Sequence, residues 1–314
     1  MSVSAKIWAL HLAVLAALLL AQFTLPPYHA NNLARIMVLA VFAMGYNISF
    51  GYTGLLSLGH ALFFAAGMYG AGLAVWQMEW TLFPAMALGL VAGGVVAGAV
   101  GLLALRTVGV SFMIVTLMFA QAGYLIILYF GRFTGGDEGF VVEAVGRQAF
   151  GYDLAHDGPR ALAAFTMFGV ALLAKLALVR SPFGRVMVAM RENEERSRML
   201  GYNPFRVKLI ALVISGIYAG VAGAAYGVLF GYVGANFAGV QYSILPMLYV
   251  LMGGAGVVLG PLLGAAAMFY LIDFASSLTS AHLLVVGVAL VLLVLFAPRG
   301  LLGMVRERWL PWLP

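Results

Sequence analysis

Residues 82–105 read LFPAMALGLVAGGVVAGAVGLLAL, an apolar run that contains no charged residue. Because a helix of roughly 20 apolar residues crosses the hydrocarbon core of a bilayer, this stretch predicts a transmembrane helix. The whole chain has the same character, since 64% of its 314 residues are hydrophobic and only 9% are charged. Soluble domains carry roughly a quarter of charged residues. The composition therefore excludes a soluble enzyme and a disordered regulator, and it predicts an integral membrane protein.

Further apolar runs of similar length predict that the chain crosses the membrane many times. They lie at residues 7–25, 33–50, 55–76, 108–130, 161–179, 209–232 and 282–297. A ninth region, 245–276, is interrupted by several glycines and the pair Gly260-Pro261, and its two halves each look too short to span. This region predicts a broken segment, either a re-entrant loop or a hairpin of two short helices. We therefore expect an all-α polytopic transmembrane helix bundle with eight to ten crossings, formed by one domain over residues 1–314.

Two polar loops of opposite charge give the expected orientation. Residues 180–208 hold seven basic and three acidic side chains, whereas residues 131–160 hold three basic and five acidic ones. Since cytoplasmic loops are enriched in Lys and Arg, we expect 180–208 to be cytoplasmic and 131–160 to be periplasmic, with both termini in the cytoplasm. Arg35 departs from this bias, because it lies near an outward helix end. The basic excess belongs to a membrane loop, so no nucleic acid partner is expected.

A second break in the apolar pattern lies at residues 51–60, which read GYTGLLSLGH. Non-helical backbone within a membrane needs protein or a water-filled cavity around its polar groups. We therefore expect this segment and residues 253–261 to line or support a pathway through the membrane. The candidate pathway residues are Gly54, Ser57, His60, Gly253, Gly254 and Pro261. For His60, and equally for Asp273, two alternatives stay open: a polar contact within the bundle, or a part in the pathway.

Motif searches exclude the common catalytic and metal sites. The chain has no cysteine, no Walker-type Gly-x4-Gly-Lys, no His-Glu-x-x-His and no Gly-x-Ser-x-Gly, and its five histidines are scattered. We therefore expect no enzyme activity, cofactor or metal. Glycines four residues apart, such as Gly89 and Gly93 or Gly216 and Gly220, predict close helix packing. The sequence also lacks the intramembrane ion-pair network typical of carriers driven by protons or sodium, so energy for transport would come from elsewhere.

The basic loop 180–208 contains signals for short helices. Ser181-Pro182 suits a helix start, Gly201 suits a stop, and Asn203-Pro204 suits the start of the next helix. A short amphipathic helix held between two membrane spans either docks a soluble partner or lies on membrane lipid.

At this point the sequence resembles the permease subunits of ATP-binding-cassette (ABC) importers, and specifically the branched-chain amino acid, LivM-type family. The matching motifs are GYTGLLSLGHALFF at 51–64, TGGDEG at 134–139, SPFGR at 181–185, RENE at 191–194, LGYN at 200–203, GPLLG at 260–264 and PRGL at 298–301. The resemblance implies a permease of the bacterial inner membrane. It further implies four kinds of partner: two ABC ATPase subunits, a homologous permease subunit, a periplasmic substrate-binding protein and membrane lipid.

In importers of this class the cytoplasmic loop provides a coupling helix that seats in a groove of the ATPase subunit. The family pattern is Glu-Ala-Ala followed three residues later by Gly. Here Glu195 stands six residues before Gly201, but Arg196 and Ser197 replace the two alanines. The resemblance implies that the ATPase-docking residues are Arg191, Glu192, Glu195, Leu200, Gly201 and Asn203.

The substrate and two other function classes remain open at this stage. Leucine, isoleucine and valine are the commonest substrates of such importers, but family members also serve urea, short amides and aromatic acids. A self-contained secondary carrier or channel would also use discontinuous helices. A membrane-embedded enzyme is the third alternative. Stand-alone transport by the purified chain would favour the carrier.

Overall fold

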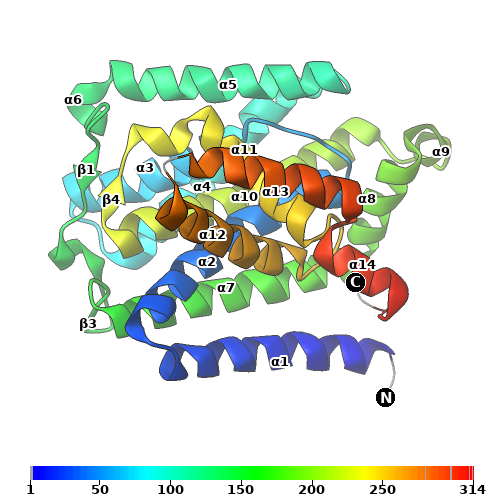
Figure 1. The fold of residues 1–314 in the computed structure, drawn as a ribbon. Coiled ribbons are helices and arrows are strands. Elements are labelled where there is room, and N and C mark those ends of the chain that lie inside the picture. The colour runs from blue at the N-terminus through cyan, green and yellow to red at the C-terminus, as the bar shows by residue number, and fades with distance from the viewer. Residues whose placement is uncertain (1–2, 280, 298, 311, 313) are drawn as a thin grey trace.

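The computed structural model describes residues 3–279, 281–297, 299–310, 312 and 314 of the chain. Pro298, the first residue of the predicted PRGL motif, lies outside them. Most of the described chain is helical, which confirms the all-α prediction (Figure 1). The helices are α1 (Val3–Thr24), α2 (Pro27–Asn47), α3 (His60–Met78), α4 (Leu82–Ala104), α5 (Val110–Tyr129), α6 (Gly131–Thr134), α7 (Asp157–Arg180), α8 (Pro182–Glu192), α9 (Glu194–Met199), α10 (Pro204–Phe230), α11 (Val240–Gly253), α12 (Gly260–Leu278), α13 (His282–Phe296) and α14 (Gly300–Arg308).

The other elements are short. A π-helical turn, η1 (Ile48–Tyr52), continues α2, and two 3-10 turns are η2 (Ala144–Arg147) and η3 (Ala235–Ala238). The strands are β1 (Phe140–Val141), β2 (Gln148–Ala149), β3 (Tyr152–Asp153) and β4 (Tyr232–Val233). β1 pairs antiparallel with β4, and β2 pairs antiparallel with β3. The β1–β4 pair ties the loop 131–160 to the turn that follows α10.

The two polar loops lie at opposite ends of the bundle. Figure 1 shows α8, α9 and α14 at one end, where α1 also begins. The loop 131–160, with α6, β1 and β3, lies at the other end (Figure 1). We call these the α9 end and the β1 end.

Eight described helices are long and apolar enough to cross a membrane: α1, α2 with η1, α3, α4, α5, α7, α10 and α12. Seven of them coincide with predicted runs. The expectation that both halves of 245–276 are too short to span is wrong for the second half, because α12 has 19 residues. Pro261 sits in the first turn of α12, where its missing N–H costs nothing, so the Gly-Pro pair starts this helix. The predicted run 282–297 forms α13, but with 15 residues this helix is not among the eight that are long enough to span.

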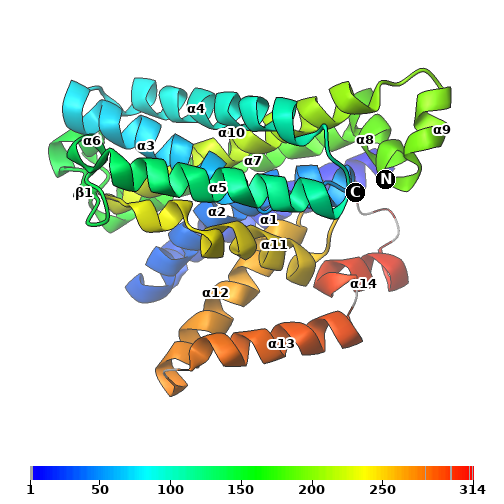
Figure 2. The same cartoon turned by 90° about the horizontal axis from the view of Figure 1, so that it is seen from above.

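The predicted break at residues 253–261 is present, and it joins two antiparallel helices. A Cβ on Gly264 would collide with the Tyr249 carbonyl, and one on Gly253 would collide with the Gly260 carbonyl. These contacts pair the end of α11 with the start of α12 in opposite directions. Both alternatives, the re-entrant loop and the hairpin, contain such an antiparallel pair, which we call the α11–α12 hairpin. Figure 2 shows α12 leading away from the body of the bundle toward α13.

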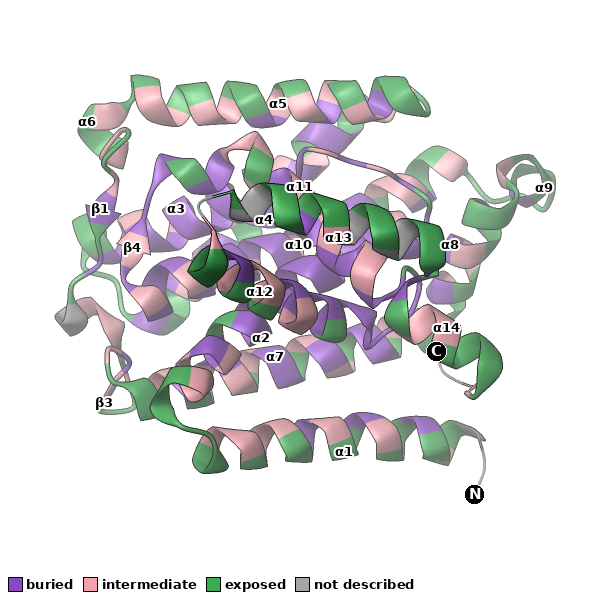
Figure 3. Cartoon of the chain, viewed as in Figure 1, coloured by how far each residue is buried: buried purple, intermediate pink, exposed green. Residues whose placement is uncertain are grey.

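The centre of the bundle is formed by α2, α3 and α10, and α4 packs against α3 and α10. Buried residues concentrate there in Figure 3, and 83% of the apolar stretch of α2 is buried, against 11% for α1. Glycines bring α10 against its neighbours, since a Cβ on Gly93 would lie 2.5 Å from the Gly216 oxygen and one on Gly220 would lie 2.6 Å from the Gly89 oxygen. The predicted glycine faces are packing seams between helices.

Candidate functional site

The loop between α7 and α10 folds into two short helices, and each is capped by a side chain. The Ser181 hydroxyl accepts a hydrogen bond from Gly184 N at the start of α8, and the Asn203 side chain accepts one from Arg206 N at the start of α10. Gly201 has a φ of 91°, as the predicted helix stop requires. The break at Asn193, whose Oδ1 accepts from Arg196 N at 2.8 Å, was missed in the sequence. It divides the expected single helix into α8 and α9.

All six expected ATPase-docking residues are exposed at the α9 end. Leu200 is 72% exposed, and the others are Arg191, Glu192, Glu195, Gly201 and Asn203. An exposed leucine beside charged residues on a projecting helix is a surface suited to a protein partner. Figures 1 and 2 show α9 projecting from the bundle.

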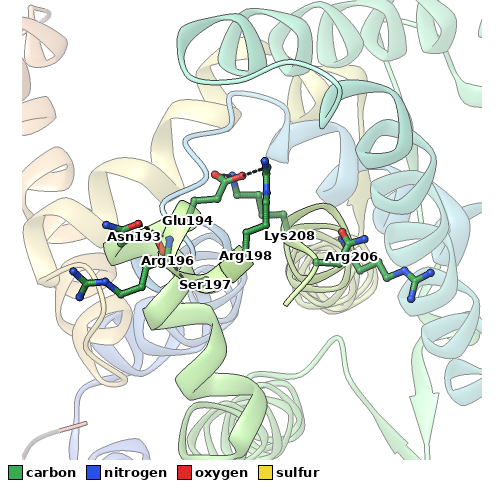
Figure 4. A network of polar contacts seen from close by, with 8 residues as sticks. Asn193, Glu194, Arg196, Ser197, Arg198, Arg206 and Lys208 are labelled. Carbon is green, nitrogen blue, oxygen red and sulfur yellow. Dashed lines mark hydrogen bonds and ion pairs between the residues drawn. The ribbon is translucent and has the colours of Figure 1, made fainter. Parts of the chain in front are cut away.

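Glu194 anchors α9 to the start of α10. Lys208 Nζ donates to Glu194 Oε2 at 2.5 Å, and Arg198 Nη2 lies 3.8 Å from Glu194 Oε1 (Figure 4). Sequence reasoning did not select Glu194, although its spacing to Arg198 is that of a helical i,i+4 ion pair. The anchor couples the position of α9 to the membrane helix α10.

A cavity of about 970 Å³ opens between this loop and the first helix break. Its lining includes Gly54 and Leu56 from the break, Met113 from α5, and Tyr202 and Lys208 beside α9. Gly54 is the one exposed member of the six expected pathway residues, all of which the structure describes. The loop 180–208 and the first break therefore line the same cavity.

The two breaks, far apart in the sequence, lie against each other. Asn47, at the end of α2, donates from Nδ2 to the Val257 carbonyl at 2.8 Å and accepts from Gly256 N at 2.9 Å through Oδ1. A Cβ on Gly51 would lie 2.5 Å from Gly256 N. One buried amide side chain thus satisfies unpaired backbone groups of the second break.

Three cations from three helices bind the backbone of the two breaks. Arg191 of α8 donates to the Gly51 carbonyl, Arg306 of α14 donates to the Gly256 carbonyl at 3.3 Å, and Lys175 of α7 donates to the Val258 carbonyl at 3.2 Å. Sequence reasoning assigned Arg191 to ATPase docking. The structure places its guanidinium against the first break, so this residue links α8 to the membrane segment.

His60 lies in a buried network between α2, α3 and α10. His60 Nε2 lies 2.7 Å from Ser215 Oγ and 3.3 Å from Ser49 Oγ. Both hydroxyls already donate, Ser215 to the Gly45 carbonyl and Ser49 to the Tyr46 carbonyl. Nε2 must therefore carry the proton and donate. Of the two alternatives for His60, the geometry corresponds to a contact within the bundle.

The remaining expected pathway residues are also enclosed. Ser57 is buried and accepts from Gly59 N at 3.1 Å, Gly253 and Pro261 are buried in the α11–α12 hairpin, and Gly254 lies against α14. Asp273 accepts a hydrogen bond from Tyr28 Oη at 2.7 Å at the β1 end. Within the part of the chain that is described, no cluster of His, Asp and Glu residues suits a metal ion.

Residues 28–297 match the family described as branched-chain amino acid transport system / permease component. The chain is 29% identical over 298 residues to the high-affinity branched-chain amino acid transport system permease protein LivM of Escherichia coli (strain K12), covering 87% of this chain and 69% of that protein. It is 26% identical over 287 residues to LivH, a permease protein of the same transport system in that organism, covering 84% and 91%.

A shorter match of 107 residues, 30% identical, is to the autoinducer 2 import system permease protein LsrC of Photorhabdus laumondii, covering 32% and 31%. No solved structure matches the chain.

The family match covers the membrane helices from α2 through α13. This is a family of transport permeases and not of enzymes. The chain is a multi-pass membrane protein and belongs to the family of branched-chain amino acid ABC transporter permeases.

Proposed function

We propose that this chain is the permease subunit of an ATP-driven importer that moves leucine, isoleucine and valine across the inner membrane. It works beside a homologous permease subunit, two ABC ATPase subunits hydrolyse the ATP, and a periplasmic binding protein hands over the substrate. The family match and the transport system printed in the names of the LivM and LivH relatives support this substrate class.

The observation that carries the proposal is the contact between α8 and the first break. In the proposed mechanism, α9 seats in the ATPase through Glu192, Glu195, Leu200, Gly201 and Asn203. Closure of the ATPase subunits on nucleotide displaces α8 and α9 together. Arg191, which donates to the Gly51 carbonyl, carries that displacement to both breaks, because these lie against each other. Movement of the breaks then opens and closes the pathway, where Gly54 borders the cavity.

Uptake by the reconstituted importer tests the function. With the ATPases, the partner permease and the loaded binding protein present, vesicles should accumulate leucine only when ATP is supplied. Glu195→Lys reverses a charge on the exposed face of α9, so uptake and stimulated ATP hydrolysis should fall together while membrane insertion stays normal. Uptake of urea or an amide instead of leucine would show that the substrate class is wrong. ATP-independent uptake by the purified chain would show that the protein is a carrier and not an importer subunit.

Labelling of single cysteines tests the proposed orientation, in which the α9 end and both termini are cytoplasmic. The chain has no cysteine of its own. Tyr152 in the loop 131–160 is 67% exposed, and Met199 of α9 is 85% exposed. On intact spheroplasts an impermeant maleimide should label Tyr152→Cys and spare Met199→Cys until the membrane is opened. The reverse pattern would show that the α9 end is periplasmic, and an ATPase in the cytoplasm could then not dock there.

A further inference from the structure

Arg35 occupies an unusual position in the most enclosed helix of the bundle. Between His29 and Ser49, it is the only exposed residue of the α2 segment. A charged side chain in an apolar membrane helix is costly, and it usually faces a water-filled space or a partner. Because α2 is central, an exposed charge on it stands out and calls for water or a binding partner beside it.

The surroundings of Arg35 leave its charge uncompensated. Its Cζ lies 5.2 Å from the centre of the Phe230 ring, and Cζ of Arg160 lies 5.8 Å from the same ring. Arg160 is paired, since it donates to Asn31 Oδ1 at 2.7 Å and forms an ion pair with Asp157. Arg35 makes no hydrogen bond or ion pair with any residue that the structure describes. The two arginines share one aromatic ring, but Arg160 is paired through Nη2, whereas no described residue pairs with Arg35.

An aromatic wall extends from the Phe230 ring. Tyr226 lies 4.9 Å from Phe230 and 5.2 Å from Phe237, and Phe237 lies 4.8 Å from Tyr242, measured between ring centres. Arg35 lies against the Phe230 end of this wall. Tyr226, Phe230 and Tyr242 are each only partly buried.

We propose that Arg35 and the wall of Tyr226, Phe230 and Tyr242 form a transient binding site for the carboxylate of the transported amino acid. A guanidinium stacked on a ring keeps its fork of N–H donors free, and this fork matches a carboxylate. The rings of the wall receive the apolar side chain of the solute. This inference rests on the proposed function, because it takes an amino acid as the substrate.

The position of the site suits a solute that binds before it reaches the two helix breaks. Phe64, one helical turn after His60, lies 5.8 Å from Tyr242 between ring centres. The helices that carry them meet where Ala61 N donates to Ser243 Oγ at 3.1 Å. A solute bound at Arg35 therefore rests on the β1 side of the junction between α3 and α11. A single cation holds it loosely enough to leave again.

Chemical protection of Arg35 provides a direct test. The complete importer in phosphatidylcholine nanodiscs is treated with phenylglyoxal, which modifies free guanidinium groups, and the modified peptides are resolved by mass spectrometry in the nucleotide-free and vanadate-trapped states. Leucine at about twice its dissociation constant should slow modification of Arg35 about threefold in at least one state. Leucinamide, which has the same side chain and no carboxylate, should not slow it. Arg160 is the internal control, because its Nη2 already donates to Asn31 and pairs with Asp157.

Transport by variants provides the second readout. Arg35→Gln should lower leucine uptake about tenfold, since it removes a charge-assisted hydrogen bond to the carboxylate, while the loaded binding protein still stimulates ATP hydrolysis. Arg35→Lys, which keeps the charge without the fork, should be intermediate. Arg132→Gln, at an exposed position of the same end, removes an equal charge and should leave uptake unchanged.

Three results would overturn the proposal: equal protection by leucine and leucinamide, no protection in either state, or normal uptake by Arg35→Gln. A lipid phosphate as the true partner would show as Arg35 reactivity that rises in phosphate-free maltoside detergent and ignores leucine. If the wild-type importer moves no amino acid, the proposed function fails as well. Normal wild-type leucine uptake together with any of the three results rejects the Arg35 site alone.

Discussion

The cations of the two ends of the bundle differ in what they bind. Toward the α9 end, Lys175, Arg191 and Arg306 each donate to a backbone carbonyl of a helix break. Toward the β1 end, Arg35 has an aromatic ring beside it and no acceptor among the described residues. Unwound backbone in a membrane needs donors and acceptors at all times, whereas a passing solute needs a donor that is free before it arrives. In our proposal, paired cations maintain the breaks and the unpaired Arg35 receives a ligand.

The largest effect is expected from forcing the two breaks apart. In Gly51→Ala the new methyl group collides with the Asn47 side chain and with Gly256 N. Such overpacking costs roughly 1–3 kcal/mol, so the thermal unfolding temperature in detergent should fall and uptake should be lost. Gly158→Ala is the matched control, because a Cβ there meets open space. Equal stability of the two variants would show that the breaks tolerate separation.

A smaller effect is expected from cutting the contact between α8 and the first break. Arg191→Met removes the donor to the Gly51 carbonyl. Losing a hydrogen bond from a charged group costs roughly 1.5–3 kcal/mol, so uptake should fall by about ten- to a hundredfold. The ATPases should still bind and hydrolyse ATP, because the exposed face of α9 is intact. Arg185→Met, at an exposed position on the same helix, is the control. Parallel loss of ATPase binding would make Arg191 a docking residue instead.

The smallest effect concerns the anchor of α9. Glu194→Gln weakens the ion pairs with Lys208 and Arg198, which are partly exposed and therefore worth about 0–1 kcal/mol. ATPase stimulation should fall about twofold at low salt, and the difference from wild type should shrink at high salt because ions screen such pairs. Glu307→Gln disrupts the exposed pair with Arg299 and should leave stimulation unchanged. A defect in Glu194→Gln that persists at high salt would mean that hydrogen-bond geometry, not charge, positions α9.

Patterns that are local in the sequence predicted the fold well. The apolar runs, the glycine faces and both breaks follow from lengths and spacings of neighbouring residues, and the motifs led to the family that the comparisons show. The sequence predicted a span at 282–297, but the long helix of this region is α12. The length of α12 was missed because a Gly-Pro pair starts a helix as readily as it ends one.

The candidate site was harder to predict, because its parts come together only in three dimensions. Asn47 is an ordinary polar residue in the sequence, and nothing near it indicates that it binds Gly256 and Val257 more than 200 residues away. The inward direction of Arg191 depends on where α8 packs. Arg35 did leave a signal, since it stood out against the charge bias, but its aromatic neighbours come from α10 and α11.

The glycine seams have a mechanical consequence. Where α3, α4 and α10 meet, backbone lies directly against backbone: a Cβ on Gly89 would lie 2.8 Å from the Gly67 oxygen, and one on Gly93 would lie 2.9 Å from Gly220 N. Sliding or rotation of one helix would drive main-chain atoms together, with no flexible side chains between them to absorb the strain. We therefore expect these three helices to move as one rigid body during each transport cycle. The displacement must be taken up by the elements hinged to it, which are α2 at its π-helical end and the α11–α12 hairpin.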